Sequence, residues 1–209
     1  MFQQAGLVFE TVAPEVDEAA VKRSYREREQ SAEAAAVALA GAKALDVALR
    51  YPGAVVIGAD QVLECDGVWL DKPSSLAEAA AHIRFLRGRV HLLPTAVCCA
   101  RGDKILWSWV EVPQLVMRDL SDAFIDDYVA AEGTALLASV GAYRLESRAG
   151  NLFEQVKGNF FTILGLPLLP LIDFLKSLVD GPLWFDRDHG TDYRDVMAKL
   201  LVVNAHGRN

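Results

Sequence analysis

An aspartate that directly follows an apolar run is the first candidate for chemistry. Residues 54–59 (AVVIGA) contain no polar side chain, which is typical of a strand buried on both faces, and Asp60 follows at once. Ligands of α/β proteins bind outside the carboxyl ends of strands, so a carboxylate here is well placed to act on one. The alternative is an aspartate that only caps a turn at the end of the strand, and the pattern favours neither reading.

A lysine follows Asp60 across a predicted hairpin. The Asp-Gly pair in Cys65-Asp66-Gly67 supplies the positive φ angles of a tight turn, so the chain can fold back and bring Lys72 beside Asp60. A carboxylate can hold a divalent cation or orient a water, and a lysine neutralises phosphate oxygens. The pair therefore indicates phosphoryl chemistry, although a lone lysine in a loop is more often only solvated.

Helices and strands interleave around these two residues. The stretch 14–50 is helical in pattern, and its alanine-rich part from Ser31 to Leu49 ends before Tyr51-Pro52-Gly53. Ser75 opens a capping-box helix that runs to about Arg87. The remaining predicted strands are 7–12, 90–100, 104–112, 114–118, 152–157 and 160–164, and the remaining helices are Ser121–Ala131 and Pro167–Val179.

This order of elements predicts an α/β fold with a mixed sheet. The hairpin-like strands of 90–118 argue against a purely parallel sheet. A dinucleotide-binding fold is excluded, because no G-x-G-x-x-G follows the first strand.

The net charge limits the partners that the chain can have. Its 209 residues carry a formal charge of -7, which repels a polyanion, so nucleic acid is not an expected partner. A small phosphorylated ligand remains possible if lysines or a metal ion offset the repulsion locally. The four histidines show no zinc-site spacing.

Cysteine usage and the lack of an apolar run of membrane-spanning length indicate the compartment. The three cysteines include an adjacent pair and no C-x-x-C, which favours a reducing environment over a disulfide framework. No apolar run is long enough to span a bilayer, and the first residues lack the pattern of a signal peptide. We therefore expect a cytoplasmic protein without a membrane partner.

Several short motifs follow one another along the chain in a set order. The central one is Val56–Val62 (VIGADQV), followed by Asp66-Gly67 and Lys72-Pro73. The others are Val16-Asp17-Glu18, Ala42-Lys43-Ala44, Leu86–His91 (LRGRVH) with Thr95, Val140–Tyr143 (VGAY) and Gly165-Leu166-Pro167. Each is weak alone, but the ordered set, over roughly residues 6–179, is specific, and the chain resembles a Maf-family nucleotide pyrophosphatase.

The resemblance implies a fold and a reaction. The family has an elongated α/β fold, similar to that of inosine triphosphatases, in which a mixed sheet with flanking helices forms two lobes around a cleft. Its members are hydrolases that cleave a nucleoside triphosphate to the monophosphate and pyrophosphate with a divalent cation, here Mg²⁺ or Mn²⁺. Water attacks the α-phosphorus, and a nearby carboxylate helps as a general base.

The resemblance also implies roles for individual residues. Asp60 would be the general base or a metal-associated carboxylate, and Glu18 would be a second acidic residue at the metal and the water. Lys72 and Lys43 would contact the triphosphate, and Gln61 would sit beside Asp60 and help choose the substrate.

Two further expectations follow from the same motifs. Arg89, within the LRGRVH motif, is expected to face the cleft and contact the substrate. A homodimer is an expectation at the level of the family.

Three departures from the dTTP/UTP pattern favour the branch of the family that hydrolyses 7-methyl-GTP. Members that act on dTTP and UTP read GADT and GIQG, whereas this chain has Gln61 in place of the Thr and Leu145-Glu146-Ser147 in place of IQG. Thr162 also stands where that branch carries Asn. Glu146 would suit a cationic methylated purine. Ala142-Tyr143 looks more like the dTTP/UTP branch, so those substrates remain the alternative.

The loop L-A-S-x-S-x-R-R, with which the family opens, is absent. Either Met1 is an internal methionine of a longer protein, or the loop is lost and the protein is weak or inactive. The first explanation is favoured because Asp60, Lys72, Lys43 and Glu18 all remain. Without the strand that precedes this loop, we expect an exposed sheet edge or poor order near residues 1–30.

The boundaries expected from the resemblance are a Maf-like domain at 1–180 and a C-terminal extension at 181–209. Within the extension, Met197–Val203 (MAKLLVV) is predicted to form a short docking helix or strand.

Two other functional hypotheses stay open at this point. The chain could be a non-catalytic nucleotide-binding protein linked to cell division, or a house-cleaning enzyme for other modified nucleotides. A binder would shift its melting temperature with nucleotide but would release no pyrophosphate.

Overall fold

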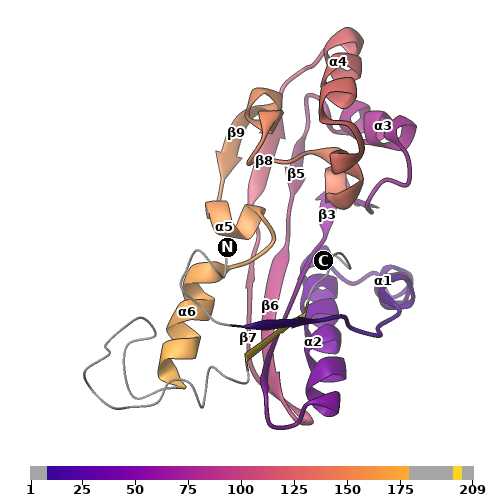
Figure 1. The fold of residues 1–209 in the computed structure, drawn as a ribbon. Coiled ribbons are helices and arrows are strands. Elements are labelled where there is room, and N and C mark those ends of the chain that lie inside the picture. The colour runs from indigo at the N-terminus through magenta and orange to yellow at the C-terminus, as the bar shows by residue number, and fades with distance from the viewer. Residues whose placement is uncertain (1–8, 179–199, 204–209) are drawn as a thin grey trace, which may run out of the picture. The chain divides into compact units, whose positions relative to one another are not determined.

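The computed structural model of the chain describes residues 9–178 and 200–203, which divide into two compact units (Figure 1). Unit 1 contains the described residues up to Asp60, Ala96–Val110, and those from Leu166 onward. Unit 2 contains Gln61–Thr95 and Glu111–Gly165.

The first sheet belongs mainly to unit 1 and has five strands in the order β1-β10-β2-β6-β7. These strands are β1 (Glu10–Val12), β10 (Leu200–Val203), β2 (Val55–Gln61), β6 (Thr95–Arg101) and β7 (Lys104–Glu111). β10 pairs parallel with β1 on one side and with β2 on the other. The turn Gly102–Asp103 joins the last two strands.

The strand β10 comes from the predicted C-terminal extension. Of the segment Met197–Val203, for which a short helix or strand was predicted, residues 197–199 lie outside the described residues and the rest form β10. Val202 lies opposite Thr11 on one neighbour and Ile57 on the other, so β10 supplies the only sheet partner of β1 among the described residues. Among the described strands, β1 lies at the edge of this sheet, within the region 1–30 where an exposed edge was expected.

Two helices cover part of unit 1 where a single helical stretch was predicted. The stretch 14–50 divides into α1 (Glu18–Glu27) and α2 (Ala32–Arg50). Asp17 caps α1 by accepting a hydrogen bond from the Ala20 N–H, and Ser31 caps α2 by accepting one from the Ala34 N–H. Since each cap starts a new helix, the stretch is broken between them.

Close packing holds α2 against β2. A Cβ atom on Gly58 would lie 2.4 Å from the backbone oxygen of Ala40 and 2.8 Å from the backbone nitrogen of Ala44. Only glycine allows this approach, because such distances lie inside van der Waals contact. The alanine-rich face of α2 therefore sits directly on the strand that ends at Asp60.

The second sheet belongs to unit 2 and is antiparallel throughout. Its strands, in the order β4-β3-β5-β8-β9, are β4 (Val68–Leu70), β3 (Leu63–Cys65), β5 (Val90–Leu92), β8 (Gln114–Met117) and β9 (Phe153–Lys157). The predicted hairpin is confirmed: Asp66 and Gly67 both have positive φ, at 51° and 78°, in the two-residue turn between β3 and β4.

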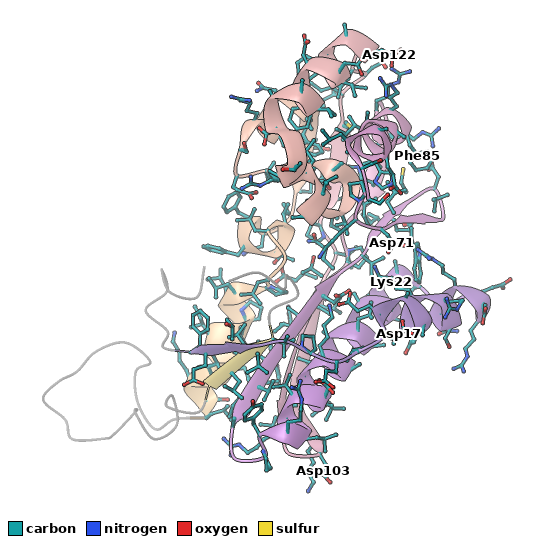
Figure 2. The ribbon with its side chains drawn as sticks, turned by 45° about the vertical axis from the view of Figure 1, so that its right-hand side comes forward. Asp17, Lys22, Asp71, Phe85, Asp103 and Asp122 are labelled. Atoms are coloured by element: carbon teal, nitrogen blue, oxygen red, sulfur yellow. The ribbon has the colours of Figure 1, made fainter. Side chains whose placement is uncertain are left out.

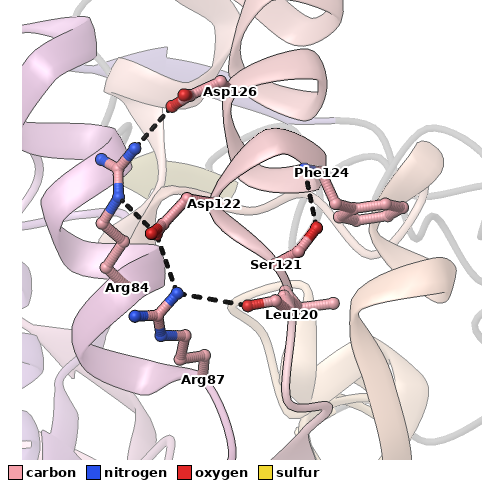
Figure 3. Close-up of polar contacts among 7 residues, drawn as sticks. All are labelled: Arg84, Arg87, Leu120, Ser121, Asp122, Phe124 and Asp126. Carbon is pink, nitrogen blue, oxygen red and sulfur yellow. Dashed lines mark hydrogen bonds and ion pairs between the residues drawn. The ribbon is translucent and has the colours of Figure 1, made fainter.

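Charged residues join the two main helices of unit 2, α3 (Leu76–Leu86) and α4 (Asp122–Glu132) (Figure 3). Ser75 and Ser121 cap them, as predicted. Arg84 pairs with Asp122 at 3.1 Å and with Asp126 at 2.5 Å, and Arg87 pairs with Asp122 at 2.8 Å. These contacts position the start of α4 beside the end of α3.

Two predicted strands have a different structure. The predicted strand 160–164 was wrong, because Asn159 accepts a hydrogen bond from the Phe161 N–H and caps a short helix, α5 (Phe160–Ile163). The predicted strand 90–100 is two strands, β5 and β6, which lie in different sheets. Pro94 separates them, since proline has no N–H to donate to a sheet.

The remaining elements in the described part of the chain are three 3₁₀ helices, η1 (Gly133–Ala138), η2 (Val140–Ala142) and η3 (Arg148–Leu152), and the helix α6 (Leu168–Ser177). Parallel and antiparallel strands with flanking helices confirm the predicted α/β class with mixed strand directions, although the strands form two sheets. Within the described ranges, no helix has the length and apolar character needed to cross a membrane.

The position of β10 within the sheet predicts that its buried side chains contribute to the stability of the fold. Leu201 is 6% exposed, so Leu201→Ala should lower the free energy of unfolding by about 2–4 kcal/mol in urea denaturation, through lost burial and the cavity left behind. Leu49→Ala is the matched control, because Leu49 is 62% exposed and its loss should cost less than about 0.5 kcal/mol. Equal effects of the two changes would contradict the placement of β10 in the sheet.

Candidate active site

Three charged side chains of unit 1 meet where β2 ends. Asp60 lies near the end of β2, Lys43 lies on α2, and Glu18 is the first residue of α1. Because Gly58 lets α2 approach β2 closely, the Lys43 side chain reaches the strand end. We call Glu18, Lys43 and Asp60 the carboxylate–lysine cluster.

Lys43 bridges the two carboxylates of this cluster. Its Nζ donates a hydrogen bond to Asp60 Oδ1 and forms an ion pair with Glu18 Oε1 at 2.9 Å. The side chains of Lys43 and Asp60 are 1% and 8% exposed, whereas that of Glu18 is 39% exposed. The cluster is therefore closed on the side of α2 and accessible at Glu18.

Burial and neighbouring charges have opposite effects on the pKa values of Asp60 and Lys43. Burial raises the pKa of Asp60 above its ordinary value, although the neighbouring Lys43 and, more weakly, Lys22 oppose this. Burial acts to lower the pKa of Lys43, but Asp60 and Glu18 together raise it above its ordinary value. The lysine thus stays charged, and Asp60 is more basic than an exposed carboxylate. Figure 2 labels Lys22 on the same helix as Glu18.

The second oxygen of Asp60 is left without a partner. Oδ2 is buried and accepts no hydrogen bond within the described chain, which is unusual for a carboxylate oxygen. Together with the half-exposed Glu18, it offers oxygen ligands of the kind that Mg²⁺ and Mn²⁺ prefer. The described residues contain no group of three or more His, Cys, Asp or Glu that could hold a metal. A cation held here would have only these two carboxylates as ligands among the described residues, so it would need further ligands from a substrate or from water.

The predicted substrate-binding residues of unit 2 lie at exposed positions. Lys72 is exposed in the loop after β4. Arg89 pairs with Asp66 of the hairpin turn at 3.2 Å, and its guanidinium lies 4.6 Å from the centre of the Phe85 ring. Glu146 forms a surface ion pair with Arg144 at 3.1 Å. Their predicted contacts with a substrate stay predictions.

Gln61 is held by a separate set of contacts in unit 2. It follows Asp60 in β2, so the two side chains point to opposite faces of the strand. Its Nε2 donates to Thr95 Oγ1 at 2.8 Å and to the backbone oxygens of Thr162 and Ile163, each at 3.2 Å. Gln61 is thus adjacent to Asp60 in the chain but belongs to a different hydrogen-bond network.

Two residues of the motifs have structural roles. His91 is buried, and its Nε2 lies 2.8 Å from the Tyr143 hydroxyl, which is also buried. Burial lowers the pKa of His91 to about 4, so the ring is neutral at neutral pH. The pair joins β5 to the segment that follows η2.

Sequence reasoning missed two residues beside these sites. Lys22 acts on Asp60 through its charge, and Glu111 accepts a hydrogen bond from Thr162 Oγ1. Neither belongs to a motif. Lys22 lies in α1 and Glu111 is the last residue of β7, so only the fold brings them to these positions.

Comparison with known proteins shows the family. The profile of the Maf-like protein family matches residues 1–178, and the chain belongs to this family. The resemblance found in the sequence is thereby confirmed.

Curated relatives cover most of the chain. A protein of Granulibacter bethesdensis, called nucleoside triphosphate pyrophosphatase, is 49% identical over 85% of this chain and 90% of its own length. One of Rhodospirillum rubrum with the same name is 45% identical over 84% of this chain and 87% of its own length. A protein of Rhizobium meliloti, called 7-methyl-GTP pyrophosphatase, is 43% identical over 85% of this chain and 89% of its own length.

The contacts within the cluster predict that Lys43 and Asp60 are energetically coupled. Lys43→Met leaves Asp60 as a buried carboxylate without its cation and should lower the free energy of unfolding by about 3–5 kcal/mol. In the double variant Lys43→Met/Asp60→Asn both charges are gone, so its loss should be smaller than the sum of the two single losses by about 2 kcal/mol. Urea denaturation of the wild type and the three variants measures this. Additive losses would show that the two side chains do not interact.

Proposed function

We propose that this chain is a nucleoside triphosphate pyrophosphatase, a hydrolase that cleaves a nucleoside triphosphate to the monophosphate and pyrophosphate. The observation that carries the proposal is the carboxylate–lysine cluster, in which a buried, basic Asp60 keeps one oxygen unpartnered beside the accessible Glu18. The names of the curated relatives support the same activity.

Asp60 is the catalytic carboxylate in this proposal. It accepts a proton from the attacking water while the new oxygen–phosphorus bond forms at the α-phosphorus. The bond from the α-phosphorus to the bridging oxygen breaks, and pyrophosphate leaves. A raised pKa suits this role, because a general base works best when its pKa lies near the working pH.

Lys43 positions Asp60, in addition to its predicted contact with the triphosphate. Its ammonium holds Asp60 through Oδ1 and so leaves Oδ2 free for a water or a ligand. Asp60 and Glu18 would hold a divalent cation, Mg²⁺ or Mn²⁺, which supplies Lewis-acid polarisation and charge neutralisation when bound. Lys72 and Arg89 would add positive charge for the phosphates, which an acidic protein requires.

The substrate favoured within this class is 7-methyl-GTP. Gln61, Leu145-Glu146-Ser147 and Thr162 support that branch of the family, and the relative from Rhizobium meliloti carries that name. The alternative is dTTP or UTP, which Ala142-Tyr143 favours.

Pyrophosphate release tests the proposal directly. With Mg²⁺ or Mn²⁺, the chain should release pyrophosphate from at least one of 7-methyl-GTP, GTP, UTP and dTTP. Asp60→Asn should lower kcat by about 10²–10⁴-fold, the range that general-base catalysis supplies. The ranking of the four substrates decides between the two branches.

Asp103→Asn is the matched control, because this aspartate is exposed at the turn between β6 and β7, where Figure 2 labels it. It should keep the wild-type rate. Full turnover by Asp60→Asn would rule out the assigned role of this residue. A wild-type chain that melts at a higher temperature with nucleotide but releases no pyrophosphate would be a non-catalytic binder.

A further inference from the structure

A lysine lies on the packed face of α1, beside the carboxylate–lysine cluster. The half-buried positions of this helix include Glu18, Val21, Lys22 and Tyr25, which have the three- and four-residue spacing of one helix face. Glu18 contacts Lys43 of α2 at 2.9 Å, so this face is turned toward the cluster. Lys22, labelled in Figure 2, therefore projects from the same side of α1 as Glu18, about 6 Å farther along the helix.

Lys22 differs in position from the other basic side chains of this segment. Arg23, Arg26 and Arg28 are all exposed, whereas Lys22 is half-buried. The positive charge of Lys22 also acts on Asp60, whose pKa it tends to lower, although Asp60 itself is almost completely buried. The ammonium group of Lys22 is therefore part of the electrostatic surroundings of the cluster.

The cluster on its own has an excess of negative charge. Asp60 and Glu18 are two carboxylates, and the single ammonium of Lys43 lies between them with only 1% of its side chain exposed. A polyphosphate that approaches from the accessible side of Glu18 would therefore be repelled. A divalent cation offsets this repulsion where it is bound, and the phosphates farther from it need a positive side chain. Lys22 is a lysine of that kind on the helix that bears Glu18.

The position of Lys22 indicates which phosphates it can meet. In the proposed reaction Asp60 acts at the α-phosphorus, and Lys22 lies one helical turn beyond Glu18. The β- and γ-phosphates extend away from the α-phosphorus and carry most of the negative charge of the triphosphate. A lysine ammonium is a compact charge with three donors, which can follow phosphate oxygens as they move.

We propose that Lys22 binds the β- and γ-phosphates of the substrate and holds the pyrophosphate as it leaves. This inference rests on the proposed function and adds a substrate-contacting residue to it. When the bond from the α-phosphorus to the bridging oxygen breaks, negative charge moves onto the pyrophosphate, and the Lys22 ammonium donates hydrogen bonds to its oxygens. The nucleoside monophosphate retains only the α-phosphate and does not contact Lys22.

The two products, measured separately, test the proposal. Calorimetry gives the affinities of the wild type and its variants for magnesium pyrophosphate and for the monophosphates GMP and UMP. Lys22→Met keeps an unbranched chain without the charge. It should weaken the binding of pyrophosphate by about 10-fold and leave the binding of the monophosphates unchanged. The same variant should raise the KM for the triphosphate by about 10-fold.

Two further variants control for charge and for folding. Lys22→Arg should keep most of the affinity for pyrophosphate, because a guanidinium also binds phosphate oxygens. Arg23→Met removes the same charge from an exposed position of the same helix and should change neither affinity. In urea denaturation Lys22→Met should be as stable as Arg23→Met, which would show that the loss of affinity is not a loss of folded protein.

Several results would overturn the proposal. Equal affinities of the wild type and Lys22→Met for pyrophosphate would show that this lysine does not contact the leaving group. An equal loss of affinity for pyrophosphate and for the monophosphates would place Lys22 at the α-phosphate or in a structural role. An equal loss of pyrophosphate affinity in Arg23→Met would show that only the net charge matters.

Binding and turnover separate this inference from the proposed function. Binding of pyrophosphate that depends on Lys22, without pyrophosphate release from any triphosphate, would support the inference and contradict the hydrolase. Turnover of a triphosphate that does not change in Lys22→Met would do the reverse. A chain that binds neither product and releases no pyrophosphate would contradict both.

Discussion

The site depends on one buried lysine that lies between two carboxylates. An unpaired ammonium or carboxylate in this position would be strongly unfavourable, and the ion pairs remove that penalty. Lys43 can reach Asp60 only because Gly58 allows the alanine-rich helix α2 to pack directly on β2. Glu18 reaches the same lysine because Asp17 caps α1 at the preceding residue and fixes where that helix begins. The charge balance of the cluster and the backbone packing around it therefore depend on each other.

The alternation of side chains at the end of β2 separates two sets of contacts. Asp60 points to one face and joins a charged cluster that keeps a basic oxygen available. Gln61 points to the other face, where three uncharged acceptors hold the nitrogen of its amide. Two adjacent residues thus take part in separate sets of contacts, one charged and one uncharged.

Local sequence patterns predicted the parts of this structure that local chemistry determines. The pair Asp66-Gly67 indicated the turn between β3 and β4, and Ser75 and Ser121 indicated where α3 and α4 begin. Positive φ angles and helix caps depend only on neighbouring residues. Asp60 stood out because it follows an apolar strand. Local patterns could not predict contacts between segments that are distant in the sequence. β10 enters the sheet between β1 and β2, and Glu111 reaches Thr162 only because of the fold. The apolar run at 160–164 resembled a strand, and the cap at Asn159 made it a helix.

The central claim is that water attacks the α-phosphorus of a nucleoside triphosphate with Asp60 as the base. Hydrolysis in ¹⁸O-labelled water, followed by mass spectrometry of both products, tests it most directly. The account predicts one ¹⁸O atom in the nucleoside monophosphate and none in the pyrophosphate. Label in the pyrophosphate would place the attack at the β-phosphorus, and orthophosphate with a nucleoside diphosphate would show a different reaction. Either result would contradict the account.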